Sequence, residues 1–160
     1  TSLDFMGNGA SKWTQQKDLL EEMLKKSYSA NGQVRFLILN PACDVCIKGS
    51  EVYGIDQSKK IVESLLVFRD LDMRHTNLHL RLYDHKPEFR LTFIDQETVS
   101  VGHYNQYQED SKDTPLHIYR HRGEWSFYKA YKTYYDNTWE RAKEVDWDQI
   151  EQLHRAHLSK

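Results

Sequence analysis

The order of hydrophobic and polar residues along the chain predicts strands and helices in alternation. Apolar residues at every second position, or in a short unbroken run, indicate a strand, whereas apolar residues three and four positions apart indicate one face of a helix. In the first half, the expected elements are a strand over 2–6, a helix from Ser11 or Thr14 to about residue 29, a strand over 34–39, a loop over 42–55 and a helix from Asp56 or Ser58 to about residue 72.

The second half is richer in strands. The expected elements are strands over 78–83, 89–94, 98–104 and 116–120, a polar loop over 107–114, a long aromatic helix over 125–143 and a terminal helix over 147–158. Short turns join the first three of these strands, so we expect them to lie side by side as a meander. The order β-α-β-α-β-β-β-β-α, with a last helix, predicts an α/β fold in which helices flank a mixed sheet.

Composition narrows the class of protein. The 160 residues, 39% hydrophobic and 29% charged, fit one globular domain over 1–145 with a helical extension over 146–160. With 22 Lys and Arg against 24 Asp and Glu, the net charge of −2 argues against a generally basic nucleic-acid binder. No apolar run approaches the roughly 18 residues of a transmembrane segment. We find no signal peptide and only two cysteines, so we expect a cytoplasmic protein, and because it begins with Thr1, a fragment or a chain without its start.

The strongest chemical signal lies on the strand over 89–94 and the strand after it. The run Glu88-Phe89-Arg90-Leu91-Thr92-Phe93-Ile94-Asp95 is followed by Gly102-His103-Tyr104-Asn105. This arrangement resembles the phospholipase D superfamily, whose members carry His-x-Lys-(x)4-Asp on a strand and Gly-Ser-x-Asn after it. The resemblance implies a phospholipase D-like fold.

Individual positions match that motif only in part. Asp95 stands where the family has its Asp, while Arg90 replaces the Lys and Glu88 replaces the His. Downstream, the Gly and the Asn match Gly102 and Asn105, and His103 replaces the Ser.

The replacements imply a loss of catalysis. In active members of the superfamily the His attacks phosphorus, the Lys neutralises phosphate oxygens, and a second His protonates the leaving group. Glu88 places negative charge where an anionic phosphodiester must lie, and it is a poorer general acid near neutral pH. Arg90 is still able to bind phosphate with two hydrogen bonds. We therefore expect a pseudoenzyme without cofactor that binds phosphate or another anion, as a regulatory or scaffolding module.

Two alternatives stay open. One is an active phosphodiesterase, a nuclease or phospholipase, in which Glu88 or His103 carries the covalent or acid–base step and Asp95 orients a partner. The other is a protein-interaction domain without a small ligand, in which residues 7–11 merely pack and Arg90 forms a salt bridge. An ordinary amphipathic hairpin also places Glu88 and Arg90 on one face.

A second signal lies in the turn after the first strand, Gly7-Asn8-Gly9-Ala10-Ser11-Lys12. Such a turn either presents backbone N–H groups to an anion or simply begins a helix. Asn40, before Pro41, follows the second strand, and open α/β sheets bind ligands at the carboxyl ends of their strands. The expected pocket is lined by Gly7, Gly9, Ser11, Asn40, Arg90, His103 and Asn105.

The cysteines and the histidines give weaker signals. Cys43 and Cys46 are spaced as half of a zinc site or as a redox pair, but no second pair exists in the sequence. We predict no metal site; Cys43 and Cys46 are the candidates if one is present. The short basic run 120–122 is either a solvated strand end or a contact to phosphate, so nucleic acid remains an alternative partner. The family resemblance also implies a homodimer, or pairing with another domain of a longer chain.

Overall fold

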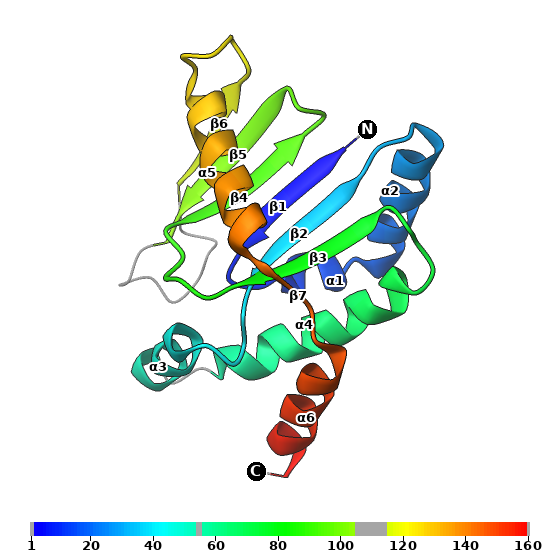
Figure 1. Cartoon of the computed structure of the whole chain (residues 1–160), viewed down its shortest axis with the longest axis vertical. Coiled ribbons are helices and arrows are strands. Elements are labelled where there is room, and N and C mark those ends of the chain that lie inside the picture. The colour runs from blue at the N-terminus through cyan, green and yellow to red at the C-terminus, as the bar shows by residue number, and fades with distance from the viewer. Residues whose placement is uncertain (1, 54–55, 105–114, 160) are drawn as a thin grey trace.

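A single mixed sheet forms the centre of the protein in our computed structural model, which describes residues 2–53, 56–104 and 115–159 (Figure 1). Within these residues the strand order is β6-β5-β4-β1-β2-β3-β7. The strands are β1 (Leu3–Gly7), β2 (Val34–Leu39), β3 (Leu78–Tyr83), β4 (Phe89–Ile94), β5 (Thr98–His103), β6 (Leu116–Arg120) and β7 (Lys143–Glu144). Strands β1, β2 and β3 are parallel, and the remaining pairs are antiparallel. The expected α/β class, a mixed sheet between helices, is confirmed.

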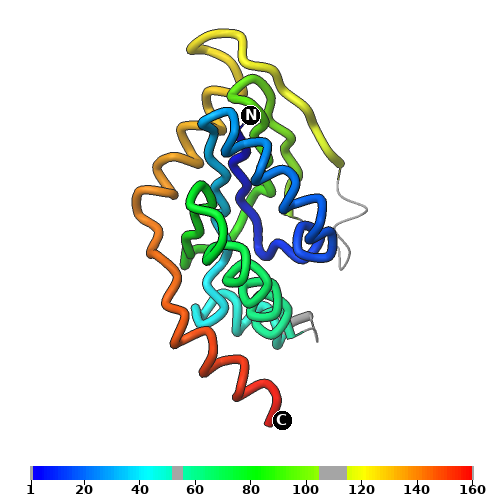
Figure 2. The backbone as a smooth tube through the Cα atoms, turned by 90° about the vertical axis from the view of Figure 1, so that its right-hand side faces the viewer, coloured from blue at the N-terminus to red at the C-terminus, as the bar shows by residue number. Residues whose placement is uncertain are grey.

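Helices cover the two faces of this sheet unequally. The helices are α1 (Ser11–Thr14), α2 (Lys17–Ser29), α3 (Asp44–Tyr53), α4 (Gln57–Asp72), α5 (Phe127–Arg141) and α6 (Trp147–Leu158). Figure 2 shows α5 on one side of the sheet and α1, α2 and α4 on the other. No helix in the described residues is long and apolar enough to cross a membrane.

The expected three-strand meander is wrong, because β3 and β4 are not neighbours. β3 pairs with β2, whereas β4 pairs with β1 and begins a meander of β4, β5 and β6. The connection over 84–88 therefore crosses three strand spacings, about 14 Å, along the end of the sheet. Five extended residues span up to about 17 Å, so a connection that looks like a tight turn in sequence is long enough.

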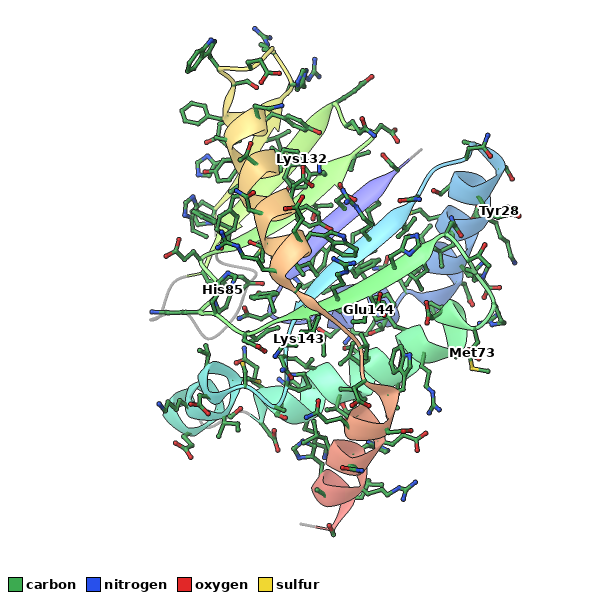
Figure 3. The ribbon with its side chains drawn as sticks, in the orientation of Figure 1. Tyr28, Met73, His85, Lys132, Lys143 and Glu144 are labelled. Carbon is green, nitrogen blue, oxygen red and sulfur yellow. The ribbon has the colours of Figure 1, made fainter. Side chains whose placement is uncertain are left out.

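Other differences concern single elements. The expected helix from residue 11 to 29 is interrupted after Thr14, and α2 begins at Lys17. The loop expected over 42–55 contains α3, which packs beside α4 and buries Cys46. Packing of α3 against α4 and burial of Cys46 stabilise this helix. The two-residue strand β7 was not expected, and Figure 3 shows its Lys143 and Glu144 beside β3. The loop expected over 107–114 lies outside the described residues.

Well-patterned elements formed as expected. Asp56 is the N-cap of α4, since its Oδ1 accepts a hydrogen bond from Lys59 N at 2.9 Å. The buried stripe of α4 packs on the sheet, with the rings of Phe36 and Phe68 4.6 Å apart. The terminal helix α6 packs against α4, where Glu151 forms an ion pair with Arg69.

A buried group of charges holds α5 on the sheet. Asp4 of β1 and Arg35 of β2 are register partners, and Arg35 Nε and Nη2 each donate a 2.6 Å hydrogen bond to the Asp4 carboxylate. From α5, Lys132 Nζ lies 3.4 Å from Asp4 Oδ2, and Asp136 pairs with both Lys132 and Arg35. Figure 3 shows Lys132 on α5. Two cations and two carboxylates therefore meet at one point between the layers.

Aromatic rings enclose Arg35 in this network. Its guanidinium carbon lies 5.3 Å from the centre of the Tyr135 ring and 5.2 Å from that of Trp139, within cation–π range. Burial opposes the charge of Arg35, but the hydrogen bonds to Asp4 and its charge outweigh that effect and raise the pKa of Arg35. The guanidinium is thus charged, desolvated and dependent on Asp4.

We expect Asp4→Ala to destabilise the protein by about 3–5 kcal/mol, because it leaves buried Arg35 and Lys132 short of a carboxylate. Urea unfolding measures this loss. Asp70→Ala, which removes an exposed carboxylate paired with Lys17 and Arg74, is the control and should change stability far less. Equal losses in the two variants would contradict the role given to Asp4.

Candidate functional site

The candidate site lies where β1 ends and β4 begins. These strands are antiparallel, with Met6 opposite Leu91, so Gly7 at the end of β1 lies beside Arg90 near the start of β4. On the other side of β4, Arg90 is the register partner of Gly102 on β5. The pairing of strands thus brings together segments that are more than eighty residues apart in sequence.

Arg90 lies half-buried over Gly102. A Cβ atom at position 102 would lie 3.4 Å from Arg90 Nη2 and 3.5 Å from its Nε, so the missing side chain leaves room for the guanidinium. Within the described residues the Arg90 side chain forms no ion pair and no hydrogen bond. The guanidinium is therefore placed by packing, while its five N–H donors have no partner there.

Tyr104 lies next to Arg90 and closes over the turn after β1. Its hydroxyl accepts a 3.0 Å hydrogen bond from Asn8 N. A Cβ atom at Gly7 would lie 3.1 Å from that hydroxyl and 2.8 Å from the Phe5 ring, so only glycine fits. Burial raises the pKa of Tyr104, and the hydrogen bond from Asn8 and the charge of Arg90 only partly offset this rise. The neutral hydroxyl accepts from Asn8 and keeps its own proton to donate.

Asn8 contributes an unpaired polar atom at the same place. Its Oδ1 is buried and has no hydrogen-bond partner among the residues described. Tyr104 and Asn8 were both missed as site residues from sequence. Tyr104 occupies the variable position of the Gly-x-x-Asn element. Asn8 lies between Gly7 and Gly9, which were predicted to line the pocket.

Two residues of the motif lie away from Arg90. His103 is adjacent to Gly102 on β5 and therefore points to the opposite face, where its ring lies 5.1 Å from that of Phe89. Asp95 lies at the far end of β4, roughly 17 Å along the strand. It has a positive φ of 53° in the β4–β5 turn, and its Oδ1 accepts a hydrogen bond from Ser2 N at 2.9 Å. Glu88 is exposed and precedes β4, and burial together with the nearby Glu88 carboxylate raises the pKa of Tyr134 on α5.

The other residues expected to line the pocket have separate contacts. Asn40 donates through Nδ2 to Asp84 at 2.8 Å and accepts from Ala42 N at 3.0 Å, so its amide holds the ends of β2 and β3 together. Gly9 packs against α4, since a Cβ there would lie 3.3 Å from Ile61. Ser11 is exposed at the start of α1. Asn105 lies outside the described residues.

The cysteine pair lies at the start of α3. Cys46 is fully buried, and this burial raises the pKa of its thiol to about 12. Cys43 is half-buried, and both are free thiols. No group of three or more His, Cys, Asp or Glu side chains capable of holding a metal occurs in the described parts of the chain.

We expect the two thiols to differ in reactivity. At pH 8, Ellman's reagent should modify Cys43 in the folded protein and Cys46 only after unfolding, because a thiol with a pKa of about 12 is almost entirely protonated and Cys46 is also inaccessible. Absorbance of the released thiolate follows the reaction, and Cys43→Ser should abolish the first phase. Rapid modification of both thiols in the native protein would contradict this assignment.

Comparisons with known proteins give a likeness among solved structures. No family model and no curated protein matches the chain. Among solved structures, Nuc from Salmonella typhimurium, a phospholipase D family member, is similar, with a TM-score of 0.47 and 13% sequence identity. The alignment covers 91% of this chain and 82% of Nuc.

Proposed function

We propose that the chain is a phospholipase D-like domain that has lost the family's nucleophile and binds a phosphate-bearing or other anionic ligand beside Arg90. The observation that carries the proposal is the half-buried Arg90 guanidinium, which lies over Gly102 without a carboxylate partner in the described residues. The proposed module acts through binding, in a regulatory or scaffolding role.

An unpaired charge in a partly buried place costs free energy. A partly desolvated guanidinium loses hydration, and an anion that accepts two of its N–H groups restores that loss with charge-assisted hydrogen bonds. Tyr104 supports the same ligand, because its hydroxyl proton is free to donate while Asn8 N–H is already bound to its oxygen. These neighbours favour an anion with several acceptor oxygens, such as phosphate.

Two observations favour binding over hydrolysis or a purely structural role. The family's phosphoryl transfer needs a nucleophile beside the phosphate ligand, yet His103 lies on the other face of the sheet and Glu88 is a carboxylate. A domain without a small ligand was expected to engage Arg90 in a salt bridge, and the described residues form none with it.

Pyrophosphate should stabilise the protein against heat. A ligand at one hundred times its Kd adds about 2.7 kcal/mol to the free energy of unfolding, which raises the Tm of a protein of this size by roughly 5–10 °C. Arg90→Ala should abolish the shift, measured by differential scanning fluorimetry. Arg155→Ala, which removes an exposed arginine of α6, should retain it.

A second variant separates placement from charge. Gly102→Val keeps Arg90 but adds a branched side chain whose Cβ alone would already lie 3.4 Å from Nη2, so its methyl groups displace the guanidinium and we expect a smaller shift than in the wild type. Equal stabilisation of wild type, Arg90→Ala and Gly102→Val would show that the anion binds elsewhere and would overturn the proposal.

Hydrolysis of bis(p-nitrophenyl) phosphate tests the catalytic alternative. With metals chelated, we expect no release of p-nitrophenol above background, because no histidine of the motif lies on the face of Arg90. Turnover that disappears in both Arg90→Ala and Glu88→Gln would replace the binding proposal with an active phosphodiesterase that uses Glu88.

A further inference from the structure

A concave site lies at the β3–β7 side of the sheet, away from Arg90. It is a hollow of about 260 Å³ between the outer edge of β3, the ends of α4 and α5, and the start of α6. Its lining combines carboxylates, an imidazole, a guanidinium and two indoles: Asp72, His79, Arg81, Trp139, Glu144 and Trp147. Nothing in the proposed anion site uses these residues.

The two carboxylates of the hollow lack cationic partners. Asp72, in the last turn of α4, is half-buried, and its carboxylate forms no ion pair or hydrogen bond with any residue in the described ranges. Burial raises the pKa of Asp72, and the nearby His79 opposes that rise. Glu144 on β7 is exposed and likewise forms no ion pair within those ranges (Figure 3). The partly desolvated carboxylate of Asp72 therefore has no ion-pair partner among the described residues.

The backbone of β3 adds a further acceptor. Val34 N donates to Asn77 O and Asn40 N donates to Tyr83 O, so the odd-numbered residues of β3 bond to β2. The backbone groups of Leu78 and Leu80 therefore face the other edge of the sheet. There β7 pairs with Arg81 and Leu82, and Leu78 N donates to His75 O, so the carbonyl of Leu78 is the backbone acceptor at this edge of the hollow.

The one arginine in the lining is already engaged. Arg81 Nη1 donates a 2.8 Å hydrogen bond to Trp139 O, and the guanidinium carbon lies 4.9 Å from the centre of the Trp139 ring. It thus neutralises the carboxyl end of α5, where helix carbonyls carry partial negative charge. The half-buried indole of Trp147 remains available for a cation–π contact.

We propose that this hollow binds a primary alkylammonium group. An ammonium has three N–H donors and no acceptor, which matches a lining of carboxylates and a backbone carbonyl beside an indole. The volume lies just below the roughly 300–1,000 Å³ of pockets for drug-sized ligands, so it suits an amine with a short aliphatic stem. A free amine and the lysine side chain of a peptide carry this same group.

Titration followed by tryptophan fluorescence tests the proposal, with n-butylammonium chloride and Nα-acetyl-lysine methylamide as probes and tetramethylammonium chloride at equal ionic strength as the reference salt. We expect saturable binding of at least one primary ammonium probe, weakened roughly tenfold in Asp72→Asn. Glu63→Gln, the same chemical change on an exposed part of α4, should bind like the wild type. Trp147→Leu should remove most of the fluorescence change.

The probes also identify the source of the ammonium group. Binding of both indicates a site for free amines, whereas binding of the lysine derivative alone indicates a peptide partner. No saturable binding of either probe at millimolar concentration, or identical affinities of wild type and Asp72→Asn, would overturn the proposal. Urea unfolding checks that the Asp72→Asn variant is folded. The variant should be at least as stable as wild type near neutral pH, because ionising a carboxyl whose pKa is raised in the folded state lowers the free energy of unfolding.

Discussion

The hydrogen-bonded pair of Asp4 and Arg35 is the contact on which the layer arrangement depends. It joins the two central strands and is the point at which Lys132 and Asp136 of α5 attach. Tyr135 and Trp139, about one and two helical turns after Lys132 in α5, pack around the Arg35 guanidinium. The sequence places an acid and a base on strands that otherwise contain apolar residues, and only their pairing makes that burial tolerable.

Because α5 covers one face of β4, β5 and β6, the candidate anion site falls on the other. Leu116 and Ile118, on that face of β6, are 53% and 65% exposed, so no described helix covers it. Two glycines then shape the site. Gly102 leaves room for Arg90, and Gly7 allows the Tyr104 hydroxyl to approach the backbone of β1. The functional proposal depends on these close approaches more than on any polar motif.

Much of the fold was predictable from local patterns. The bounds of β2, β3, β4 and β6 agree with the expected ones, because each strand has a clear apolar run or alternation and ends at turn residues. The pairing of β4 with β1 was not predictable in this way. The five residues 84–88 are long enough to join β3 to an adjacent strand or to cross the end of the sheet, and the sequence does not distinguish these two connections. The helix α3 was also missed, and burial of Cys46 in its contact with the neighbouring helix α4, which stabilises it, is visible only in the folded chain.

Prediction of the site was limited by the geometry of a strand. The motif suggested that Arg90 and His103 share a pocket, but Gly102 faces Arg90 and successive residues of a strand point to opposite faces. His103 therefore lies on the α5 side with Phe89. Tyr104, at the variable position of the motif, is the residue that lies near Arg90. Its contact with Asn8 could be found only from the folded chain.

Direct observation of the Arg90 guanidinium during ligand addition tests the central claim most directly. In protein labelled with ¹⁵N, titration with pyrophosphate can be followed by NMR through the Arg90 Nε signal and the backbone amides of Asn8, Gly102 and Tyr104. If the anion binds at Arg90, these signals shift in a saturable way with one common affinity. Shifts confined to other arginines, such as Arg120 and Arg122, or no saturable shift of Arg90 Nε, would contradict binding at Arg90.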